Sequence, residues 1–552
     1  MGREANIHLI QTLEKQIEEG NGDMIKLKRA RNSLLNISTR VPPEILGEIF
    51  IWRLFRNGSR SLRSRHFDGL QKGCYNFLLV CHHWFEVASR TPELWNFWGS
   101  TLQDWKRHYH RSRAAPLDLV LNGNKSDLGV LFDGPLQVAV RSRFMQDSIR
   151  QVHLQSNDSN LLTAVILLLT PDGEGTRNEN IESIVWRTEG DRPVDVSHFF
   201  AHSRLSKLRL LDLSGNIQIS SWDGLASWTT LLTNLSLRAS EFPTPPTMTA
   251  SQLFQILASN PNLQELMLSD IALPDDVEGS AMQVQLPNLK FLSLTGDFRR
   301  VFGVLSRLIL PEALDDICLI GFDSTVEEIS QTLVPFMRDY FRRDSRFQGR
   351  LGVSFLSAPG STSISVNVLG SQAAESTQKL PFVTFTMVLD DLLPLDAQEQ
   401  LLIDLVALTP REHIVLLDAN LNMKPPEGLF FAMPNIETLS LSDVELSKGF
   451  LLPNPDGPHA NTKPFPSLRS LYLESVELDD DDWGHLTTYL ARQTSDGQLI
   501  SLEVLDAPHI PPKVVNEIKG LVGEFTYYQK PEAEGEGSPW SCSSPSEEDE
   551  WP

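Results

Sequence analysis

The apolar residues in the first part of the chain follow the spacing of an amphipathic helix. They recur mostly in steps of three or four, at Ile10, Leu13, Ile17, Met24, Leu27 and Leu34, which aligns them along one side of a helix or a coiled coil. Gly20 and Gly22 interrupt this pattern, because glycine costs about 1 kcal/mol in a helix interior. We expect residues 1–39 to form two helices, or one with a weak centre, that pack onto the next segment or dimerise.

A second helical pattern begins at Val41-Pro42-Pro43. Proline is tolerated in a first helical turn, and Glu44 lies where the positive end of the helix dipole favours a carboxylate. Apolar residues follow at spacings of one and four, at Ile45, Leu46, Ile49 and Phe50. This spacing predicts one apolar stripe on a helix that meets another protein.

A third apolar run, again with helical spacing, is Phe77-Leu78-Leu79-Val80-Cys81-His82-His83-Trp84-Phe85, followed by Thr91-Pro92-Glu93-Leu94-Trp95. Together with the second pattern it resembles the F-box, whose motif is Leu-Pro-x-Glu-Ile-Leu-x-x-Ile-Phe, then Val-Cys-x-x-Trp, then Leu-Trp. Val41 replaces the first leucine, and the matching residues are Pro42, Glu44, Ile45, Leu46, Ile49, Phe50, Val80, Cys81, Trp84, Leu94 and Trp95. The resemblance implies an F-box-like domain at 40–98 with these residues at its adaptor-binding site, the last members of the set lying partly in the core.

The chain departs from the F-box motif between the two helical segments. A polar, basic stretch between Phe55 and Gly73 lengthens the connection. Loop-closure entropy grows slowly with loop length, so such an insertion is tolerable for folding, and its effect on adaptor docking stays open. The alternative interpretation of residues 40–98 is an ordinary helical hairpin with its own core.

Leucines dominate the pattern of the longer remaining part of the chain, after an alternating strand at 115–121. The template Leu-x-x-Leu-x-Leu-x-x-Asn is filled by Leu208, Leu211, Leu213 and Asn216, and approximately by Ile149, Val152, Leu154 and Asn157. Further copies lie at Leu232/Leu235/Leu237, Leu263/Leu266/Leu268, Leu289/Leu292/Leu294, Leu314/Ile317/Leu319, Ile436/Leu439/Leu441, Leu468/Leu471/Leu473 and Leu502/Leu505. These copies resemble leucine-rich repeats, in which each unit adds a strand and a helix and buries its leucines against its neighbours.

The repeats predict an α/β fold in which the helical F-box-like domain precedes a leucine-rich-repeat solenoid of alternating strands and helices at 99–529. Leucine periodicity arising by chance in a globular α/β protein is the alternative. Helical signals between the copies include 251–260 and 396–408. The section at 338–390 fits no repeat and is either an insertion or a degenerate part of the array. Strands are predicted within it at Leu351–Leu356, Ile364–Leu369 and Phe382–Leu389.

Composition limits the compartment and the partners. The formal net charge of −23 opposes binding to nucleic acid, and no apolar run approaches the roughly 20 residues that span a membrane. Four cysteines are too few for a disulfide framework, and no export signal is apparent at the N-terminus. We therefore expect a cytoplasmic or nuclear protein that binds neither nucleic acid nor membrane. Residues 530–552 are predicted to form a disordered acidic tail.

Signatures of catalysis or cofactor binding are missing from the sequence. It contains no phosphate-binding loop, nucleophile elbow or His-Glu-x-x-His helix. Cys74, Cys81 and His82-His83 are poorly spaced for zinc, because neighbours on one helix cannot all face one ion. The acidic run 479–482 is better explained as a helix N-terminus than as a calcium loop. We expect no catalytic, cofactor-binding or metal-binding residues.

The two resemblances together imply a function. F-box proteins with C-terminal repeats are substrate receptors of SCF-type cullin-RING ubiquitin ligases, which implies a Skp-type adaptor and cullin as partners and an unknown protein target on the repeats. The chain itself would then be non-catalytic. Two alternatives stay open: a repeat scaffold that mediates protein interaction without ubiquitination, and an enzyme of unfamiliar class within 338–388.

Overall fold

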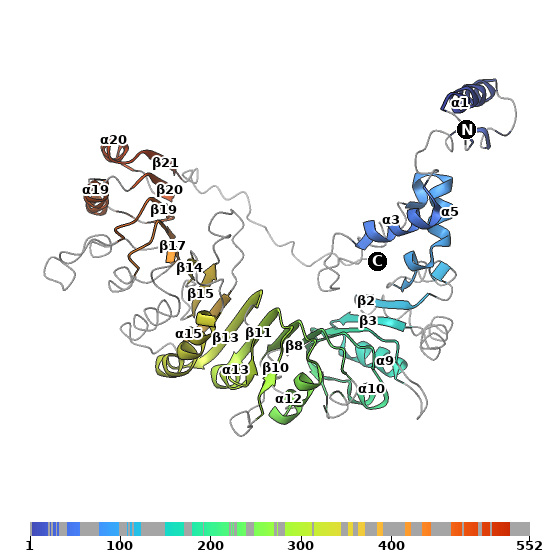
Figure 1. Ribbon diagram of the computed structural model, residues 1–552, viewed down its shortest axis with the longest axis horizontal. Helices are drawn as coiled ribbons and strands as arrows, with labels where there is room; N and C mark the ends of the chain where they lie inside the picture. Colours follow the sequence, from blue (N-terminus) through green and yellow to red (C-terminus); the bar gives the residue numbers. More distant parts are fainter. Residues whose placement is uncertain are drawn as a thin grey trace, which may run out of the picture. The chain divides into compact units, whose positions relative to one another are not determined.

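The computed structural model of the chain describes residues 3–19, 23, 26–28, 30–31, 41–55, 77–98, 108, 111–112, 115–122, 149–170, 179–190, 192–219, 222, 225, 229–238, 248–269, 273, 282–311, 314–343, 351–356, 363–369, 383–389, 414–420, 433–442, 465–476, 478, 480–494, 499–507 and 510–529. The chain divides into two compact units, residues 1–289 with 307–309 and residues 290–306 with 310–552. Each unit is mixed α/β and contains a large, mainly parallel arrangement of strands with helices beside it (Figure 1).

Helices form the start of the first unit. They are α1 (Arg3–Glu18), α3 (Pro43–Phe55), α5 (His82–Arg90) and the 3-10 helix η3 (Pro92–Leu94), and residues 77–80 are helical as well. Two helices, or one with a weak centre, were predicted near the N-terminus; α1 ends at Glu18, just before the two glycines, and residues 26–28 and 30–31 beyond them are helical as well. Residues 20–22 and most of the insertion, at 56–76, lie outside the described residues.

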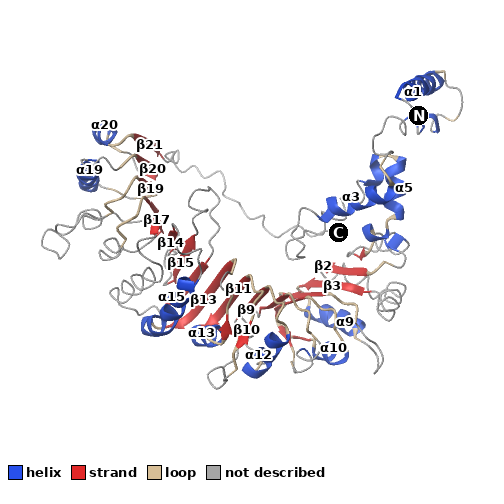
Figure 2. Cartoon of the chain, in the orientation of Figure 1, coloured by secondary structure: helices blue, strands red, loops and turns tan. Residues whose placement is uncertain are grey.

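A parallel sheet follows in the first unit. Its strands are β1 (Phe97–Trp98), β2 (Leu117–Asn122), β3 (Ile149–Ser156), β4 (Ser183–Thr188), β6 (Leu210–Gly215), β8 (Asn234–Arg238) and β9 (Glu265–Ser269), each paired with the next in this order. Parallel neighbours need crossover connections, and helices α9 (Ser159–Leu169), α10 (Ser197–His202) and α12 (Ala250–Ser259) lie in three of them, after β3, before β6 and after β8. Figure 2 shows these helices on one side of the sheet.

Leucines align across this sheet in register. Leu211 lies opposite Leu235, which lies opposite Leu266, and the leucines two residues further along each strand align in the same way. All of them are buried, because alternate residues of a strand point to the same face. Two short parallel pairs form separate two-stranded sheets: β5 (Val194–Asp195) with β7 (Ile217–Gln218), and β10 (Val284–Gln285) with β12 (Leu308–Ile309).

One glycine in the first unit is required by its surroundings. Gly215 ends β6 with φ +93°, and a Cβ built there would lie 1.7 Å from the carbonyl oxygen of Thr188 on β4. Only glycine adopts this conformation without strain. The close approach of the two strands at this end of the sheet therefore depends on the missing side chain.

The second unit contains a sheet with an altered strand order. Its strands are β11 (Phe291–Asp297), β13 (Asp316–Ser324), β14 (Leu351–Leu356), β15 (Ser363–Leu369), β16 (Val383–Leu389), β17 (Ile414–Asn420), β18 (Thr438–Ser442), β19 (Ser470–Glu474), β20 (Ser501–Ala507) and β21 (Glu524–Gln529). Strands β17 to β21 pair consecutively and in parallel, and the leucines of β18, β19 and β20 align as in the first unit.

The section at 338–390, which fits no repeat in the sequence, accounts for the altered order. All three strands predicted there are present. β16 pairs in parallel with β13, β14 pairs in parallel with β17, and β15 lies between β14 and β16, antiparallel to both. The spatial order is therefore β13, β16, β15, β14, β17, so the section continues the sheet in an order that differs from the order of its strands in the sequence.

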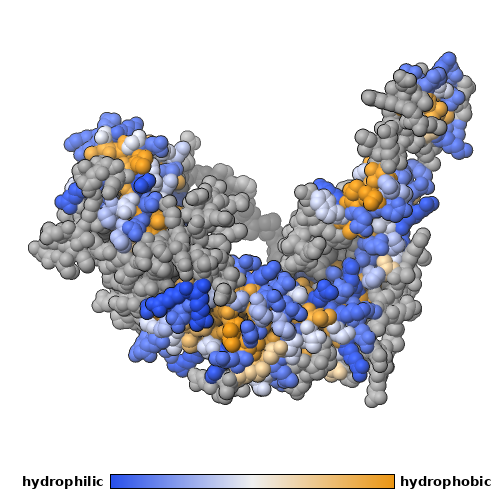
Figure 3. All heavy atoms as spheres, in the orientation of Figure 1, coloured by the Kyte–Doolittle hydropathy of each residue, from blue (hydrophilic) through white to orange (hydrophobic). Residues whose placement is uncertain are grey.

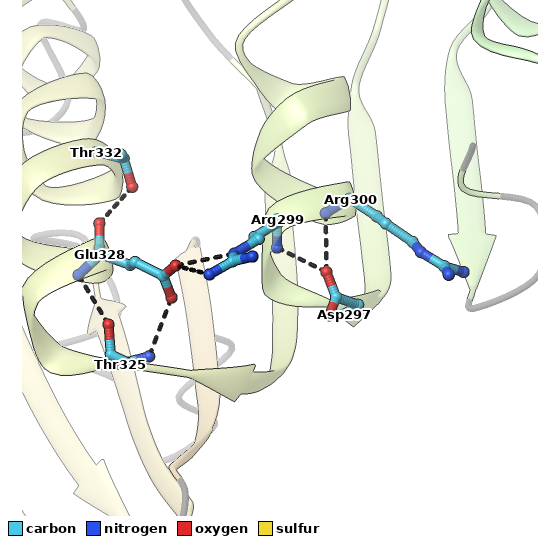
Figure 4. Close-up of polar contacts among 6 residues, drawn as sticks. All are labelled: Asp297, Arg299, Arg300, Thr325, Glu328 and Thr332. Atoms are coloured by element: carbon cyan, nitrogen blue, oxygen red, sulfur yellow. Dashed lines mark hydrogen bonds and ion pairs between the residues drawn. The ribbon is translucent and has the colours of Figure 1, made fainter. Parts of the chain in front are cut away.

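Two helices of the second unit are joined by polar contacts at their N-termini. The described helices of this unit are α13 (Phe298–Leu305), α14 (Val326–Glu328), the π-helical η7 (Ile329–Leu333), α15 (Val334–Arg343), α19 (Asp480–Thr494) and α20 (Pro512–Leu521). Asp297 caps α13, and Thr325 and Glu328 cap each other's backbone N–H groups in a reciprocal capping box (Figure 4). Arg299 donates two hydrogen bonds to the Glu328 carboxylate, at 2.8 and 2.6 Å, which ties α13 to α14.

The helix predicted at 251–260 and the helix N-terminus predicted at 479–482 are present. Helix α12 begins after Thr249, which forms a capping box with Gln252, and α19 begins within the acidic run at Asp480. The predicted helix at 396–408 and the acidic tail at 530–552 lie outside the described residues.

Candidate functional site

Helix α3 is apolar on nearly all sides, so its local sequence does not select a single buried face. The helix begins at Pro43, with the backbone N–H of Leu46 donating to the carbonyl of Pro42 at 2.9 Å. Glu44 lies in the first turn, where the helix dipole favours a negative charge. Because successive residues are rotated by about 100°, neighbouring apolar residues on this helix face different surroundings.

One side of α3 packs into a small core of the first unit. Leu46 and Phe50 are only 3% and 1% exposed. The ring of Phe50 stacks on Phe77 at a centroid distance of 4.4 Å and meets Trp84 at 4.8 Å. Leu94 completes the contact region as a fully buried member of the same cluster. Leu46 and Phe50 were predicted to contact a partner, but they lie inside the protein. Trp84 and Leu94 were predicted to do so only in part.

A second side of α3, about 110° around the helix from the buried one, exposes large apolar side chains. Ile45, Ile49 and Trp52 are 53%, 47% and 57% exposed, and their spacing of four and three places them along one stripe of the helix. Charged residues border this stripe, since Glu44, Glu48 and Arg53 of the same helix are exposed. The predicted single stripe of four residues is therefore two stripes, one buried and one exposed.

The segment that packs against α3 exposes further apolar side chains. Leu79 and Val80 precede α5, and Phe85 lies on it; their exposed fractions are 81%, 54% and 42%. We define the exposed apolar face as the six residues Ile45, Ile49, Trp52, Leu79, Val80 and Phe85. Figure 3 shows hydrophobic residues gathered over α3. Apolar side chains that cluster on a surface mark protein or membrane interaction sites.

Of the remaining predicted site residues, two stabilise the fold and two are exposed. Cys81 caps α5, its Sγ accepting a hydrogen bond from the Trp84 backbone N–H at 3.5 Å. Trp95 is fully buried, and its indole N–H donates to the carbonyl of Ala88 at 2.6 Å. Pro42 and Glu44 are exposed. Of the predicted contact residues, Leu46, Phe50, Leu94 and Trp95 are thus buried in the core; a partial core position was expected for the last two, whereas Leu46 and Phe50 were expected at the surface.

Three members of the exposed apolar face were missed from the sequence. Trp52 continues the spacing of Ile45 and Ile49 by three residues, so a longer helical window would have included it. Leu79 and Phe85 adjoin motif positions but lie outside the motif. Their exposure depends on which side of each short helix faces the core, and this is decided by the packing of Phe50, Phe77 and Trp84.

A close approach between two segments supports this packing. A Cβ at Gly47 would lie 3.0 Å from the hydroxyl oxygen of Thr91, so glycine allows α3 to lie close to the start of η3. The Thr91 hydroxyl donates to the carbonyl of Val87 at 2.8 Å. Arg111 lies 4.3 Å above the ring of Trp95 and adds a cation–π contact to the cluster.

The described ranges show neither a metal-binding cluster nor a helix that could cross a membrane. They contain no cluster of three or more His, Cys, Asp or Glu suited to holding a metal ion. None of the described helices has the length and apolar character needed to cross a bilayer.

The comparisons with known proteins give no family assignment. No model of a known protein family matches the chain, and no curated protein matches it either. The exposed apolar face and the fold around it therefore carry the functional argument.

Proposed function

We propose that the exposed apolar face is the docking surface for a Skp-type adaptor, and that the chain is a substrate-recognition subunit of an SCF-type cullin-RING ubiquitin ligase. The observation that supports this proposal is the partition of α3. Leu46 and Phe50 complete the internal core, whereas Ile45, Ile49 and Trp52 stay exposed. A helix that needed only internal packing would gain nothing from three large apolar residues on its solvent side.

The sequence resemblance selects the partner. The matching motif residues lie on the helices that carry the exposed apolar face, and an F-box binds a Skp-type adaptor through this part of its fold. Apolar residues in the centre with charged residues around them are the usual composition of a protein interface. Glu44, Glu48 and Arg53 provide such a border on α3.

The sheet of each unit supports the second half of the proposal. Parallel strands with leucines aligned in register, several of them followed by a helix, resemble the arrangement expected of a leucine-rich-repeat solenoid. We infer that these strands form such a solenoid and that it binds the target protein. The strands β14 to β16 would then interrupt the regular order of the repeats.

The mechanism of such a subunit is proximity. A chain that holds an adaptor at one site and a target at another raises the effective concentration of the target near the ubiquitin-conjugating enzyme. An encounter between separate molecules becomes nearly intramolecular. The chain then needs no catalytic residue of its own.

The test is co-purification of the tagged full-length chain with the adaptor and with cullin. Ile45→Asp with Ile49→Asp places two charges in the centre of the exposed apolar face, so we expect both partners to be lost. Leu167→Asp is the matched control, because Leu167 is 59% exposed on α9, outside this face. It should leave both partners bound.

Three results would count against the proposal. Retention of the adaptor by the double variant would contradict the assignment of the docking surface. Loss of adaptor in the Leu167→Asp control would show a general effect of added charge. Recovery of adaptor without cullin from the wild-type chain would favour a scaffold that does not promote ubiquitination.

A further inference from the structure

A buried carboxylate in the first unit holds two arginines on the face of the sheet opposite its leucines. Asp212 is the middle residue of Leu-Asp-Leu on β6, so it points away from the leucine side. One Nη atom of Arg187, on β4, lies 2.8 Å from its Oδ2, and one Nη atom of Arg238, on β8, lies 3.3 Å from both of its oxygens. We call these three residues the arginine pair and its carboxylate.

The strand register explains the arrangement. Ser214 of β6 lies opposite Arg187 on one side and opposite Arg238 on the other. The two arginines therefore stand at the same level on either side of β6, about 10 Å apart between their Cα atoms. Asp212 lies two residues earlier on the middle strand, and both guanidinium groups turn back toward it.

The two arginines leave hydrogen-bonding capacity toward solvent. The Asp212 side chain is 0% exposed, whereas those of Arg187 and Arg238 are 22% and 37% exposed. A guanidinium carries five N–H donors, and the contacts to Asp212 use one nitrogen of each. Within the described residues, the Nε atoms of both arginines are buried and donate no hydrogen bond.

The local charge is positive in a strongly acidic protein. Burial would raise the pKa of Asp212, but the hydrogen bond from Arg187 and the charges of Arg238 and Arg187 outweigh it, and the pKa lies below its usual range. Burial and the Arg187 charge lower the pKa of the nearby His153 to about 4. This histidine is therefore neutral at pH 7. Two guanidinium groups and one carboxylate leave a net charge of +1.

We propose that the arginine pair binds the carboxylate of an Asp or Glu side chain from the target protein. This inference rests on the proposed function, in which the sheet unit receives a target. A single carboxylate balances the net charge of +1, whereas a phosphate dianion would leave an excess negative charge in a poorly solvated position. The chain's net charge of −23 also repels extended polyanions, so the site suits one acidic side chain on a peptide.

Other charged groups also lie on this part of the sheet. Glu265 on β9 is on the same face but opposite Asn234, four residues before Arg238 on β8, so it stands apart from the arginine pair. Asp118 on β2 is paired with Arg150 on β3 at 2.8 Å, which leaves that pair neutral. This pairing also raises the pKa of Arg150, chiefly through the hydrogen bond to Asp118. Arg238 is the more exposed member of the arginine pair and has the weaker contact to Asp212, so it is the residue to vary.

The experiment is binding of labelled full-length chain to arrays of synthetic peptides. The peptides share random flanks and differ at one central position, which is Glu, Gln, Ser or phosphoserine. We expect Glu-centred peptides to retain about tenfold more chain than Gln-centred ones, because a charge-assisted hydrogen bond exceeds a neutral one. Arg238→Gln should abolish this preference.

Two controls separate this proposal from loss of fold and from the proposed function. Arg209→Gln removes the same charge from an exposed position outside the arginine pair and should keep the preference for Glu. Adaptor co-purification should be unchanged in Arg238→Gln, which shows that the variant is folded. If the Ile45→Asp and Ile49→Asp variant keeps its adaptor, the proposed function fails while the peptide preference is still measured independently.

Three array results would overturn the assignment. One is equal binding of Glu- and Gln-centred peptides by the wild-type chain. Another is a preference for Glu that survives in Arg238→Gln. The third is stronger binding of phosphoserine than of Glu, because it would assign a dianion to the site in place of a carboxylate.

Discussion

The adjacent residues Ile45 and Leu46 should have opposite roles, and alanine substitutions separate them. Leu46 is 3% exposed in the core of the helical region, so Leu46→Ala should cost about 2–5 kcal/mol of local stability. Ile45 is 53% exposed. Since fully burying an isoleucine is worth about 1.5–3 kcal/mol, an adaptor that covers the exposed half would gain about 0.8–1.5 kcal/mol from it.

Two measurements on the full-length chain test these values. The stability of α3 is best measured by amide hydrogen exchange of residues 43–55, because one unfolding free energy is not well defined for a chain of several parts. Leu46→Ala should raise the exchange rate at least about 30-fold, whereas Ile45→Ala should leave it nearly unchanged, since alanine is the better helix former. Adaptor affinity, by titration calorimetry, should fall about four- to thirteenfold in Ile45→Ala.

The reasoning is refuted if the two variants behave alike. Fast exchange of α3 in Ile45→Ala would mean that Ile45 belongs to the core. Full adaptor affinity in Ile45→Ala would remove it from the interface. Either outcome would contradict the division of α3 into a buried and an exposed stripe.

Two further predictions concern the sheets. Gly215→Ala should destabilise the first unit by about 4 kcal/mol or more, because the alanine Cβ would lie 1.7 Å from the Thr188 carbonyl oxygen. Gly520→Ala is the matched control: a Cβ at Gly520 would meet no atom within 4 Å, so this variant should raise the melting temperature slightly. Burial raises the pKa of Asp316 to about 6, so its contribution to stability declines as pH rises through this value. Asp316→Asn should therefore increase the free energy of unfolding by about 1 kcal/mol at pH 7.5, a figure reduced for partial exposure, and should have little effect at pH 4. Thermal unfolding at both pH values checks this, and a less stable variant at pH 7.5 would contradict it.

The repeated strands were predictable because each copy of the leucine pattern carries its own signal. Leu235 and Leu266, for example, need only alternation and a following helix to be placed on the buried side of a strand. The order of β14, β15 and β16 was not predictable, since pairing between strands that are distant in sequence leaves no mark in either strand alone. The predicted bounds of these three strands agree with the observed ones to within one residue, but the strand that each one pairs with was not predicted.

The candidate site was predictable as a region but not residue by residue. Helix α3 carries only a narrow charged strip, at Glu44 and Glu48, and apolar residues cover most of the rest, so Leu46 and Ile45 looked equivalent in the sequence. Their difference arises from the aromatic contacts of Phe50 with Phe77 and Trp84. Likewise, Arg187, Asp212 and Arg238 belong to three separate strands, and only the observed register brings them together.

The docking of an adaptor on the exposed apolar face is tested most directly by hydroxyl-radical footprinting of the full-length chain with and without the purified Skp-type adaptor. Trp52, Leu79 and Phe85 react readily when exposed, so their oxidation can be followed individually by mass spectrometry. The account predicts strong protection of these three side chains by the adaptor, with no change at the exposed Leu167 on α9. Unchanged oxidation of all three in a complex that is shown to form would contradict it.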